Sequence, residues 1–159
     1  MDVRVVSQRE FDQIMNSREI TDRTVDRLSK TFFISIIDTS GRSHFKTNHD
    51  NVLVMKFDDL TDTEWDRIAP ATQKGLNLFN EKHAKQIVDF LEKNKGKDYC
   101  MVHCAAGVSR SGAVGTFIND FYSKVDYFTF MSRNKYVKPN AYVLTTLKKV
   151  YYESDSSGQ

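Results

Sequence analysis

Short apolar runs alternate with amphipathic segments along most of this chain of 159 residues. Runs rich in β-branched and aromatic residues predict strands, and they lie at residues 3–6, 31–37, 52–55 and 99–103. Helical spacing, or a run of small apolar residues without proline, predicts helices at about 80–94, 110–122, 127–132 and 140–153. Because strands alternate with helices, we predict an α/β layered domain with a mostly parallel central sheet of about four strands flanked by helices.

Capping and turn residues define several of the predicted element ends. Ser7 and Glu10 have the spacing of a capping box, which predicts a further helix to about residue 16. Asp-Thr-Ser-Gly at residues 38–41 predicts a turn after the second strand. Gly96 predicts the end of the helix at 80–94.

Length and composition predict one domain. A chain of 159 residues with 40% hydrophobic content suits a single core, which we expect over residues 1–153, followed by a disordered tail at 154–159. The net charge of +2 is nearly balanced. No apolar run is long enough for a membrane span and no secretory leader is visible, so we expect a cytoplasmic protein with no membrane partner. We also expect a monomer.

Residues 103–111, His-Cys-Ala-Ala-Gly-Val-Ser-Arg-Ser, carry the most specific chemistry, between the last predicted strand and a predicted helix. In such a turn the backbone N–H groups of residues 105–110 can converge on one point, with the positive end of the helix dipole behind them. Gly107 permits a backbone conformation that a residue with a Cβ resists. Small side chains leave the concavity open at Ala105, Ala106 and Ser109. These features predict a site for a tetrahedral oxyanion, above all a phosphate.

Cys104 and Arg110 stand at the two ends of this loop. The N–H groups and the helix dipole favour the thiolate of Cys104, lowering a free thiol pKa of about 8.5 into the range of about 3.5–7.5 found for activated cysteines. Arg110 keeps its proton and can bind two phosphate oxygens through its planar guanidinium group. The pair therefore predicts a charged nucleophile held in line with a bound phosphorus atom.

The pattern of His-Cys, five residues, Arg and Ser resembles the signature of cysteine-dependent protein tyrosine phosphatases, in particular their small dual-specificity branch. The resemblance covers residues 52–150, with a looser match before them. It implies that Cys104 becomes a phosphocysteine, that the Ser111 hydroxyl assists departure of the thiolate, and that His103 tunes the thiol through hydrogen bonds. The phosphate-binding positions that it implies are Ala105, Ala106, Gly107, Val108, Ser109 and Arg110.

A phosphatase of this kind also needs a general acid that protonates the leaving oxygen, which contributes about 10²–10⁴-fold to the rate. Asp58 and Asp59 follow the strand at 52–55, and functional groups gather at such strand ends in α/β folds. The resemblance favours Asp59, because the second of these positions carries the acid in similar phosphatases. Asp58 is the alternative and Asp62 a third candidate. At least one of the pair is expected to have only a turn or capping role.

The resemblance also implies roles for two other parts of the chain. The interval between Asp59 and Cys104 is longer than in compact relatives, so residues 60–75 look like an insertion that could form a lid. Asn140 follows a proline before the last predicted helix, and in similar phosphatases such an asparagine braces the phosphate loop. We assign that supporting role to Asn140, with a helix cap as the alternative.

No metal ion or other cofactor is expected. Four residues of strand span about 13 Å, whereas the Cα atoms of a disulfide lie within about 7 Å, so we expect Cys100 to be a buried core residue unpaired with Cys104. The other histidines lack the spacing of metal ligands: His44, His49 and His83.

The expected substrate is a phosphoprotein that carries phosphotyrosine, with phosphoserine and phosphothreonine left open. Another phosphate ester, a phosphoinositide or an RNA 5′-phosphate, is the alternative enzyme substrate. Ala105 and Val108 are neutral where similar phosphoinositide phosphatases tend to carry lysines, and no basic tract with interleaved aromatic residues favours a nucleic-acid partner. A pseudophosphatase that only binds phosphorylated partners would lack the cysteine, the arginine or the acid, and all three residue types are present.

Overall fold

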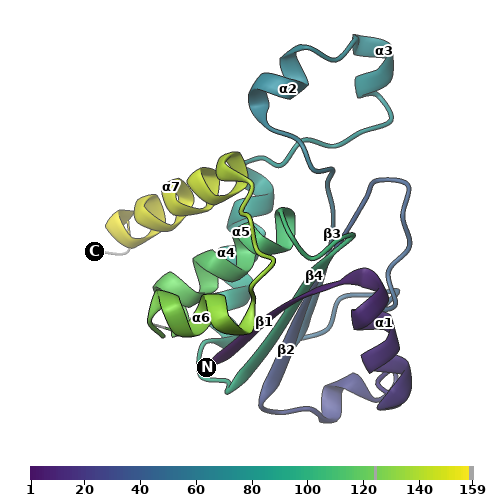
Figure 1. Cartoon of the computed structure of the whole chain (residues 1–159), viewed down its shortest axis with the longest axis vertical. Helices are drawn as coiled ribbons and strands as arrows, with labels where there is room; N and C mark the ends of the chain where they lie inside the picture. Colours follow the sequence, from purple (N-terminus) through teal and green to yellow (C-terminus); the bar gives the residue numbers. More distant parts are fainter. Residues whose placement is uncertain (124, 158–159) are drawn as a thin grey trace.

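A central sheet of four parallel strands organises the molecule, as the alternating sequence pattern predicted (Figure 1). In this computed structural model of the chain, residues 1–123 and 125–157 are described. The strands lie side by side in the order β1-β4-β2-β3. Their bounds are β1 (Asp2–Ser7), β2 (Thr31–Ile37), β3 (Val52–Lys56) and β4 (Tyr99–Cys104).

Helices cover both faces of the sheet, which explains why the central strands are nearly continuous apolar runs. Every residue of β2 after Thr31 is buried. One face carries α4 (Glu81–Asn94), α5 (Arg110–Ile118), α6 (Tyr127–Arg133) and α7 (Ala141–Ser157) (Figure 1). The other face carries α1 (Gln8–Ser17) and the 3₁₀ turn η1 (Val25–Arg27).

Alternate side chains of one strand enter two separate cores. Phe32, Ile34 and Ile36 of β2 belong to the larger core beneath α4, α5 and α7. Phe33 belongs to the smaller core, where it packs edge-on against Phe11 of α1 with the ring centroids 5.8 Å apart. Because successive strand residues point to opposite faces, one apolar run supports both layers.

Close helix packing is visible where α5 crosses β1. A Cβ atom added at Gly115 would lie 2.4 Å from Cγ2 of Val5, so a larger residue would require one of the two to shift. The chain continues from α5 into the π-helical turn η2 (Asn119–Ser123), and together the two account for the single helix predicted at 110–122.

The sequence predicted the N-terminal cap of α1 but missed that of α4. The Ser7 hydroxyl accepts a 3.1 Å hydrogen bond from the Glu10 N–H at the start of α1, as predicted. At α4 the cap is Asn80, whose side chain accepts from the His83 N–H while the His83 ring accepts from the Asn80 N–H. This capping box was missed because histidine replaces the glutamate or glutamine that the pattern requires.

Residues 60–76 form an excursion between β3 and α4 that projects from one end of the molecule (Figure 1). It contains two short helices, α2 (Asp62–Asp66) and α3 (Pro70–Gln73). Thr61 and Glu64 form a capping box at the start of α2. The segment predicted as an insertion therefore has its own local structure, and its movement as a lid stays a prediction.

The C-terminal segment corrects one prediction. Helix α7 continues to Ser157, so residues 154–157 are helical and not a disordered tail. Residues 158–159 of the predicted tail lie outside the described part of the chain. None of the helices in the described ranges is both long enough and apolar enough to cross a membrane.

Candidate active site

The loop between β4 and α5 lies at the carboxyl edge of the sheet, where the ends of the parallel strands meet. Cys104 is the last residue of β4 and only 2% exposed, and Arg110 is the first residue of α5 and 4% exposed. Ser7 of β1 is the register partner of Cys104. The strand, loop and helix thus follow one another as predicted, and residues 104–110 are called the phosphate loop below.

Three carbonyl groups of the phosphate loop are held by N–H groups from outside it. The Gln8 N–H donates to the Ala105 carbonyl (3.2 Å) and the Lys138 N–H donates to the Val108 carbonyl (3.0 Å). The Asn140 N–H donates to the Ser109 carbonyl (3.0 Å). With these carbonyls turned outward, the loop can present its own N–H groups to an anion.

Gly107 allows the phosphate loop to turn, because its φ of +73° lies in the left-handed region. A Cβ at this position would also lie 2.5 Å from the Val6 carbonyl carbon and 2.6 Å from the Ser7 nitrogen. The glycine is therefore required both by its own conformation and by the close passage of β1.

The Cys104 thiol is surrounded by hydrogen-bond donors. The Ser111 hydroxyl lies 2.9 Å from its sulfur, and the backbone N–H groups of Gly107, Val108 and Ser111 also point at it. Burial alone raises the pKa of Cys104, but these hydrogen bonds outweigh burial and hold the pKa below that of an ordinary thiol. The site thereby favours the thiolate, which is the nucleophilic form of cysteine.

His103 precedes Cys104 and has no exposed surface. Burial lowers its pKa to about 4, so its ring is neutral at pH 7. Its Nδ1 lies 3.2 Å from the Cys104 carbonyl, and since a carbonyl only accepts, Nδ1 carries the proton. The unprotonated Nε2 then accepts from the Ser35 hydroxyl at 2.6 Å. His103 contacts the backbone of Cys104 and not the phosphate side of the loop.

Arg110 is anchored along one edge of its guanidinium group. Nη1 donates to the Phe57 carbonyl at 2.8 Å and forms an ion pair of 2.7 Å with Asp38 Oδ1. Nε is buried and has no hydrogen-bond partner among the described residues. A buried donor without a partner is costly, and an oxygen of a bound phosphate can satisfy it. Asp38 was predicted only as a turn residue, although its place after β2 put it at the same sheet edge.

Asp58 and Asp59 point to different neighbours. Asp59 Oδ1 accepts a 2.8 Å hydrogen bond from the Ser109 hydroxyl and a 3.0 Å hydrogen bond from the Asn140 amide. Asp58 instead accepts from the backbone and hydroxyl of Thr39 and from the Asn77 N–H. Of these two carboxylates, Asp59 is the one bonded to the phosphate loop.

The surroundings of Asp58 stabilise its ionised form. Burial raises the pKa of this carboxyl, but the hydrogen bonds from Thr39 and Asn77, together with the charge of Arg110, lower it below its usual value. Asp62, the third candidate, lies in the first turn of α2 and accepts from the Thr63 N–H within the excursion. The assignment of Asp59 or Asp58 as the general acid stays a prediction.

Asn140 combines the two roles that the sequence left open. Its Oδ1 accepts from the Val143 N–H (3.1 Å), which caps the start of α7. Its Nδ2 donates to Asp59 and to the Leu60 carbonyl at 3.1 Å. The side-chain amide thus connects the helix to the segment that carries Asp59, and the backbone N–H of the same residue bonds to the phosphate loop.

Cys100 lies away from this chemistry. It is fully buried and free, and burial raises the pKa of its thiol well above the ordinary value. It forms no disulfide with Cys104, in agreement with the strand spacing.

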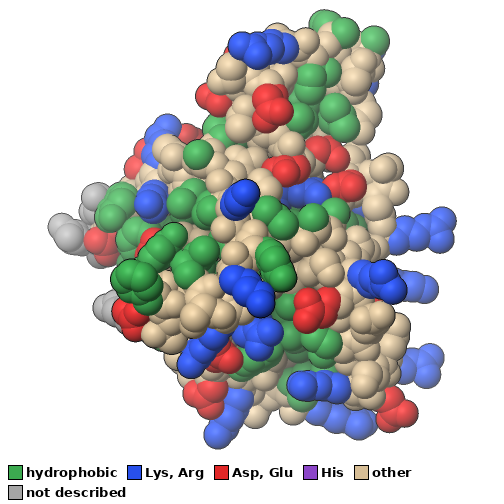
Figure 2. Space-filling model, viewed as in Figure 1, with side chains coloured by type: hydrophobic (Ala, Val, Ile, Leu, Met, Phe, Trp, Pro, Cys, Tyr) green, Lys and Arg blue, Asp and Glu red, His purple; other side chains and the backbone are tan. Residues whose placement is uncertain are grey.

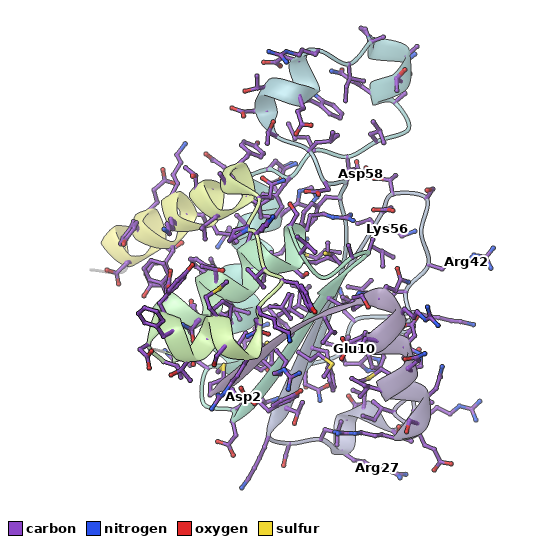
Figure 3. The ribbon with its side chains drawn as sticks, viewed as in Figure 1. Asp2, Glu10, Arg27, Arg42, Lys56 and Asp58 are labelled. Carbon is purple, nitrogen blue, oxygen red and sulfur yellow. The ribbon has the colours of Figure 1, made fainter. Side chains whose placement is uncertain are left out.

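A groove of about 460 Å³ borders the outer side of the phosphate loop. Arg4, Arg133 and Lys135 are among its basic residues, and Glu10 is its acidic one. Figure 2 shows basic side chains spread over this face of the molecule, and Figure 3 labels Glu10 near the start of α1. The groove is open to solvent, so a macromolecular surface can lie along it.

Comparisons with known proteins add little to this geometry. No protein-family model and no curated protein matches the chain. The crystal structure of human tyrosine phosphatase-like serine/threonine/tyrosine-interacting protein is similar at 20% identity and a TM-score of 0.49, covering 85% of this chain and 83% of that one. The crystal structure of Tk-PTP in the active form is similar at 17% identity and a TM-score of 0.36, covering 82% of this chain and 83% of that one.

Proposed function

We propose that this protein is a cysteine-dependent phosphatase that hydrolyses phosphate monoesters on proteins through a phosphocysteine intermediate. The observation that carries the proposal is the environment of Cys104, whose sulfur faces the Ser111 hydroxyl and three backbone N–H groups. This arrangement lowers the pKa of the thiol and surrounds it with the donors that a phosphate requires. The unpaired Nε of Arg110 supplies a further donor at the same loop.

The first half of the proposed reaction transfers the phosphoryl group to the enzyme. The Cys104 thiolate attacks phosphorus, the bond from phosphorus to the substrate oxygen breaks, and Asp59 donates its proton to that oxygen. The loop N–H groups and Arg110 stabilise the charge on the three other phosphate oxygens. Because Ser109 and Asn140 both bond to Oδ1 of Asp59, its Oδ2 is the oxygen that can carry the transferred proton.

The second half returns the enzyme to its starting state. Water attacks phosphorus, the bond from phosphorus to sulfur breaks, and the Asp59 carboxylate accepts a proton from the water. The Ser111 hydroxyl, 2.9 Å from the sulfur, stabilises the departing thiolate and inorganic phosphate is released. Atoms and protons balance over the two steps, so no cofactor is needed.

A phosphoprotein is the proposed substrate class, because a groove of about 460 Å³ that an extended peptide can follow borders the outer side of the phosphate loop. A cytoplasmic location suits the mechanism, since a reducing compartment keeps the thiol of Cys104 free. We propose that the enzyme acts as a monomer without a nucleic-acid or membrane partner.

The first experiment measures release of p-nitrophenol from p-nitrophenyl phosphate in the presence of EDTA. We expect activity in the wild type, none in Cys104→Ser, and retained activity in Cys100→Ala, the matched control at the other cysteine. Rapid acid quenching followed by mass spectrometry should find a phosphoryl group on Cys104. Activity that survives in Cys104→Ser would refute the thiolate mechanism, and a folded, reduced wild type that binds phosphopeptides without releasing phosphate would identify a binding module.

Substrate choice is tested separately with matched substrates. The proposal predicts higher kcat/KM for phosphotyrosine peptides than for a phosphoinositide or an RNA 5′-phosphate. Phosphoserine and phosphothreonine versions of the same peptide then measure dual specificity. A preference for the lipid or the RNA would contradict the proposed substrate class and leave the mechanism intact.

A further inference from the structure

Three residues from different parts of the chain are joined by hydrogen bonds at the base of the excursion, and we call them the clasp: Thr39, Asp58 and Asn77. The Asp58 N–H donates to the Asn77 carbonyl (2.9 Å), and the Asn77 N–H donates back to Asp58 Oδ2 (2.8 Å). The Thr39 N–H and hydroxyl both donate to the Asp58 carboxylate. The Asn77 amide in turn donates to the Thr39 hydroxyl at 3.1 Å.

The clasp lies where both ends of the excursion meet the body of the protein. Figure 3 labels Asp58 at this position, below the two short helices. Asp58 lies just before the excursion and Asn77 immediately follows it, so their mutual hydrogen bonds close it at its base. The clasp therefore lies between residues 60–76 and the body of the protein.

Asp59 is the residue whose position the clasp affects most directly. It is held from one side by the clasp through its covalent neighbour Asp58, and from the other side by Ser109 and Asn140. The Leu60 N–H also donates to the Asp58 carbonyl at 2.9 Å, which tightens the turn around Asp59. The carboxylate of Asp59 is thus fixed between two independent sets of hydrogen bonds.

The segment that contains Thr39 also contacts Arg110. Asp38, next to Thr39, forms the 2.7 Å ion pair with Arg110. Asp38 and Thr39, which directly follow β2, therefore hold the guanidinium group of Arg110 and the backbone that carries Asp59. Because Asp38 and Thr39 are covalently joined, they fix the distance between Arg110, which binds the phosphate, and Asp59, which protonates the leaving oxygen.

We propose that Asp58 is a positioning residue, which together with Thr39 and Asn77 fixes Asp59 over the phosphate loop so that the acid is in place before substrate binds. This inference rests on the proposed function. Asp58 does not touch the substrate and transfers no proton, because its oxygens already accept hydrogen bonds from Thr39 and Asn77. The excursion is then free to contact the phosphoprotein without having to deliver the acid.

Leaving-group dependence distinguishes positioning of the acid from a general structural role. A poor leaving group such as phenolate needs protonation, whereas p-nitrophenolate needs it much less. A variant that misplaces Asp59 should therefore lose activity on phenyl phosphate and keep most of its activity on p-nitrophenyl phosphate. A variant that merely loosens the fold should lose activity on both substrates equally.

Thr39→Val removes the hydroxyl of the clasp at nearly constant volume, and Thr39→Ser restores the hydroxyl. We expect Thr39→Val to lose about tenfold in kcat on phenyl phosphate, a part of the full effect of a general acid, with KM little changed. Thr39→Ser should recover most of this loss. Equal losses on the two substrates, or no difference between valine and serine, would overturn the positioning role.

A double-mutant cycle tests whether Asp58 acts through Asp59. Asp58→Asn places an amide nitrogen against donors, so it should reproduce the loss seen in Thr39→Val. In an Asp59→Asn background the same change should cost nothing further, and Asp59→Asn alone should remove the fall of kcat/KM at high pH. Additive losses would overturn the proposal. Loss of the high-pH fall only in Asp58→Asn would make Asp58 the acid and also overturn it.

Failure of this inference is distinguishable from failure of the proposed function. Formation of phosphocysteine from p-nitrophenyl phosphate depends on Cys104 and Arg110 and not on the clasp. If phosphocysteine forms but the clasp variants behave like the wild type on both substrates, the positioning role is wrong and the phosphatase mechanism stands. If no phosphocysteine forms in the wild type, the proposed function itself fails.

Discussion

The Ser109 hydroxyl donates a 2.8 Å hydrogen bond to Oδ1 of Asp59, across 50 positions of sequence. Ser109 lies at the start of α5, where a serine side chain usually caps the helix, yet it makes no capping hydrogen bond. Its hydroxyl is directed to the neighbouring segment instead. The phosphate loop and the proposed general acid are thereby connected side chain to side chain.

The first prediction concerns this connection. Ser109→Ala should lower kcat on phenyl phosphate several-fold and leave KM nearly unchanged, because Asn140 continues to hold Asp59 while one of its two donors is lost. Steady-state kinetics on phenyl phosphate and p-nitrophenyl phosphate measure the effect. Ser132→Ala, which removes an exposed serine hydroxyl of α6, is the control and should change neither constant. A raised KM with unchanged kcat would assign Ser109 to substrate binding.

The second prediction concerns the ionisation of Cys104. Hydrogen bonds to its sulfur lower the pKa of the thiol against the effect of burial, so removing one of them must raise that pKa. In Ser111→Ala the rate of alkylation of Cys104 by iodoacetamide should rise at a higher pH than in the wild type. Mass spectrometry identifies the alkylated residue. Coincident pH profiles for the two proteins would show that the hydroxyl has no effect on the thiolate.

Ser111→Ala should also separate the two halves of the reaction. In the proposed mechanism, formation of the phosphocysteine depends mainly on the loop N–H groups and Arg110, while its breakdown uses the Ser111 hydroxyl. We therefore expect a burst of p-nitrophenol followed by slow turnover. Absence of a burst in rapid-mixing experiments would place the hydroxyl in the first step only.

The sequence predicted those parts of the site that one continuous segment contains. Residues 103–111 include the nucleophile, the arginine and the loop glycine, so local pattern was enough to find them. The four strands were also visible as short apolar runs, and the central strands β2 and β4 are the ones buried on both faces. Because the strands are parallel, the loops that follow them lie at the same edge of the sheet.

Contacts between distant segments could not be predicted in the same way. Asp38 and Thr39 looked like ordinary turn residues, and nothing in the local pattern of Asn77 distinguishes it from other loop asparagines. Their roles arise only when β2 and β3 pair and place the two loops together. Asp58 and Asp59 are adjacent and chemically identical, so their hydrogen-bond partners differ only because folding gives them different neighbours.

The third prediction concerns the conformation of the phosphate loop. Gly107→Ala places a Cβ in the left-handed region and against the backbone of β1, so it should destabilise the fold by about 1–3 kcal/mol and abolish phosphate release. Urea denaturation measures the first effect and p-nitrophenyl phosphate turnover the second. Gly96→Ala is the matched control, since a Cβ there meets no atom within 4 Å. Equal stability of the two variants would contradict the strain assigned to Gly107.

The last prediction concerns pH and the buried ring of His103. Burial lowers its pKa to about 4 in the folded protein, whereas a histidine in the unfolded chain has an ordinary pKa of about 6.5. Between these values the unfolded state binds more protons, so the free energy of unfolding should decrease as pH falls from about 6.5 to about 4. The loss attributable to this ring is on the order of 2–3 kcal/mol.

Urea denaturation at a series of pH values across this interval measures the slope. His103→Asn removes the titrating ring and keeps a polar side chain, so its stability should be lower at pH 7 but should fall less steeply toward acid. His83→Asn is the comparison at a partly buried histidine, whose pKa burial also lowers. Because His103 is the more deeply buried of the two, its replacement should flatten the acid dependence more. If the His103→Asn curve runs parallel to that of the wild type, the ring is already protonated in the folded protein, and the hydrogen bond assigned from Ser35 to Nε2 would be reversed.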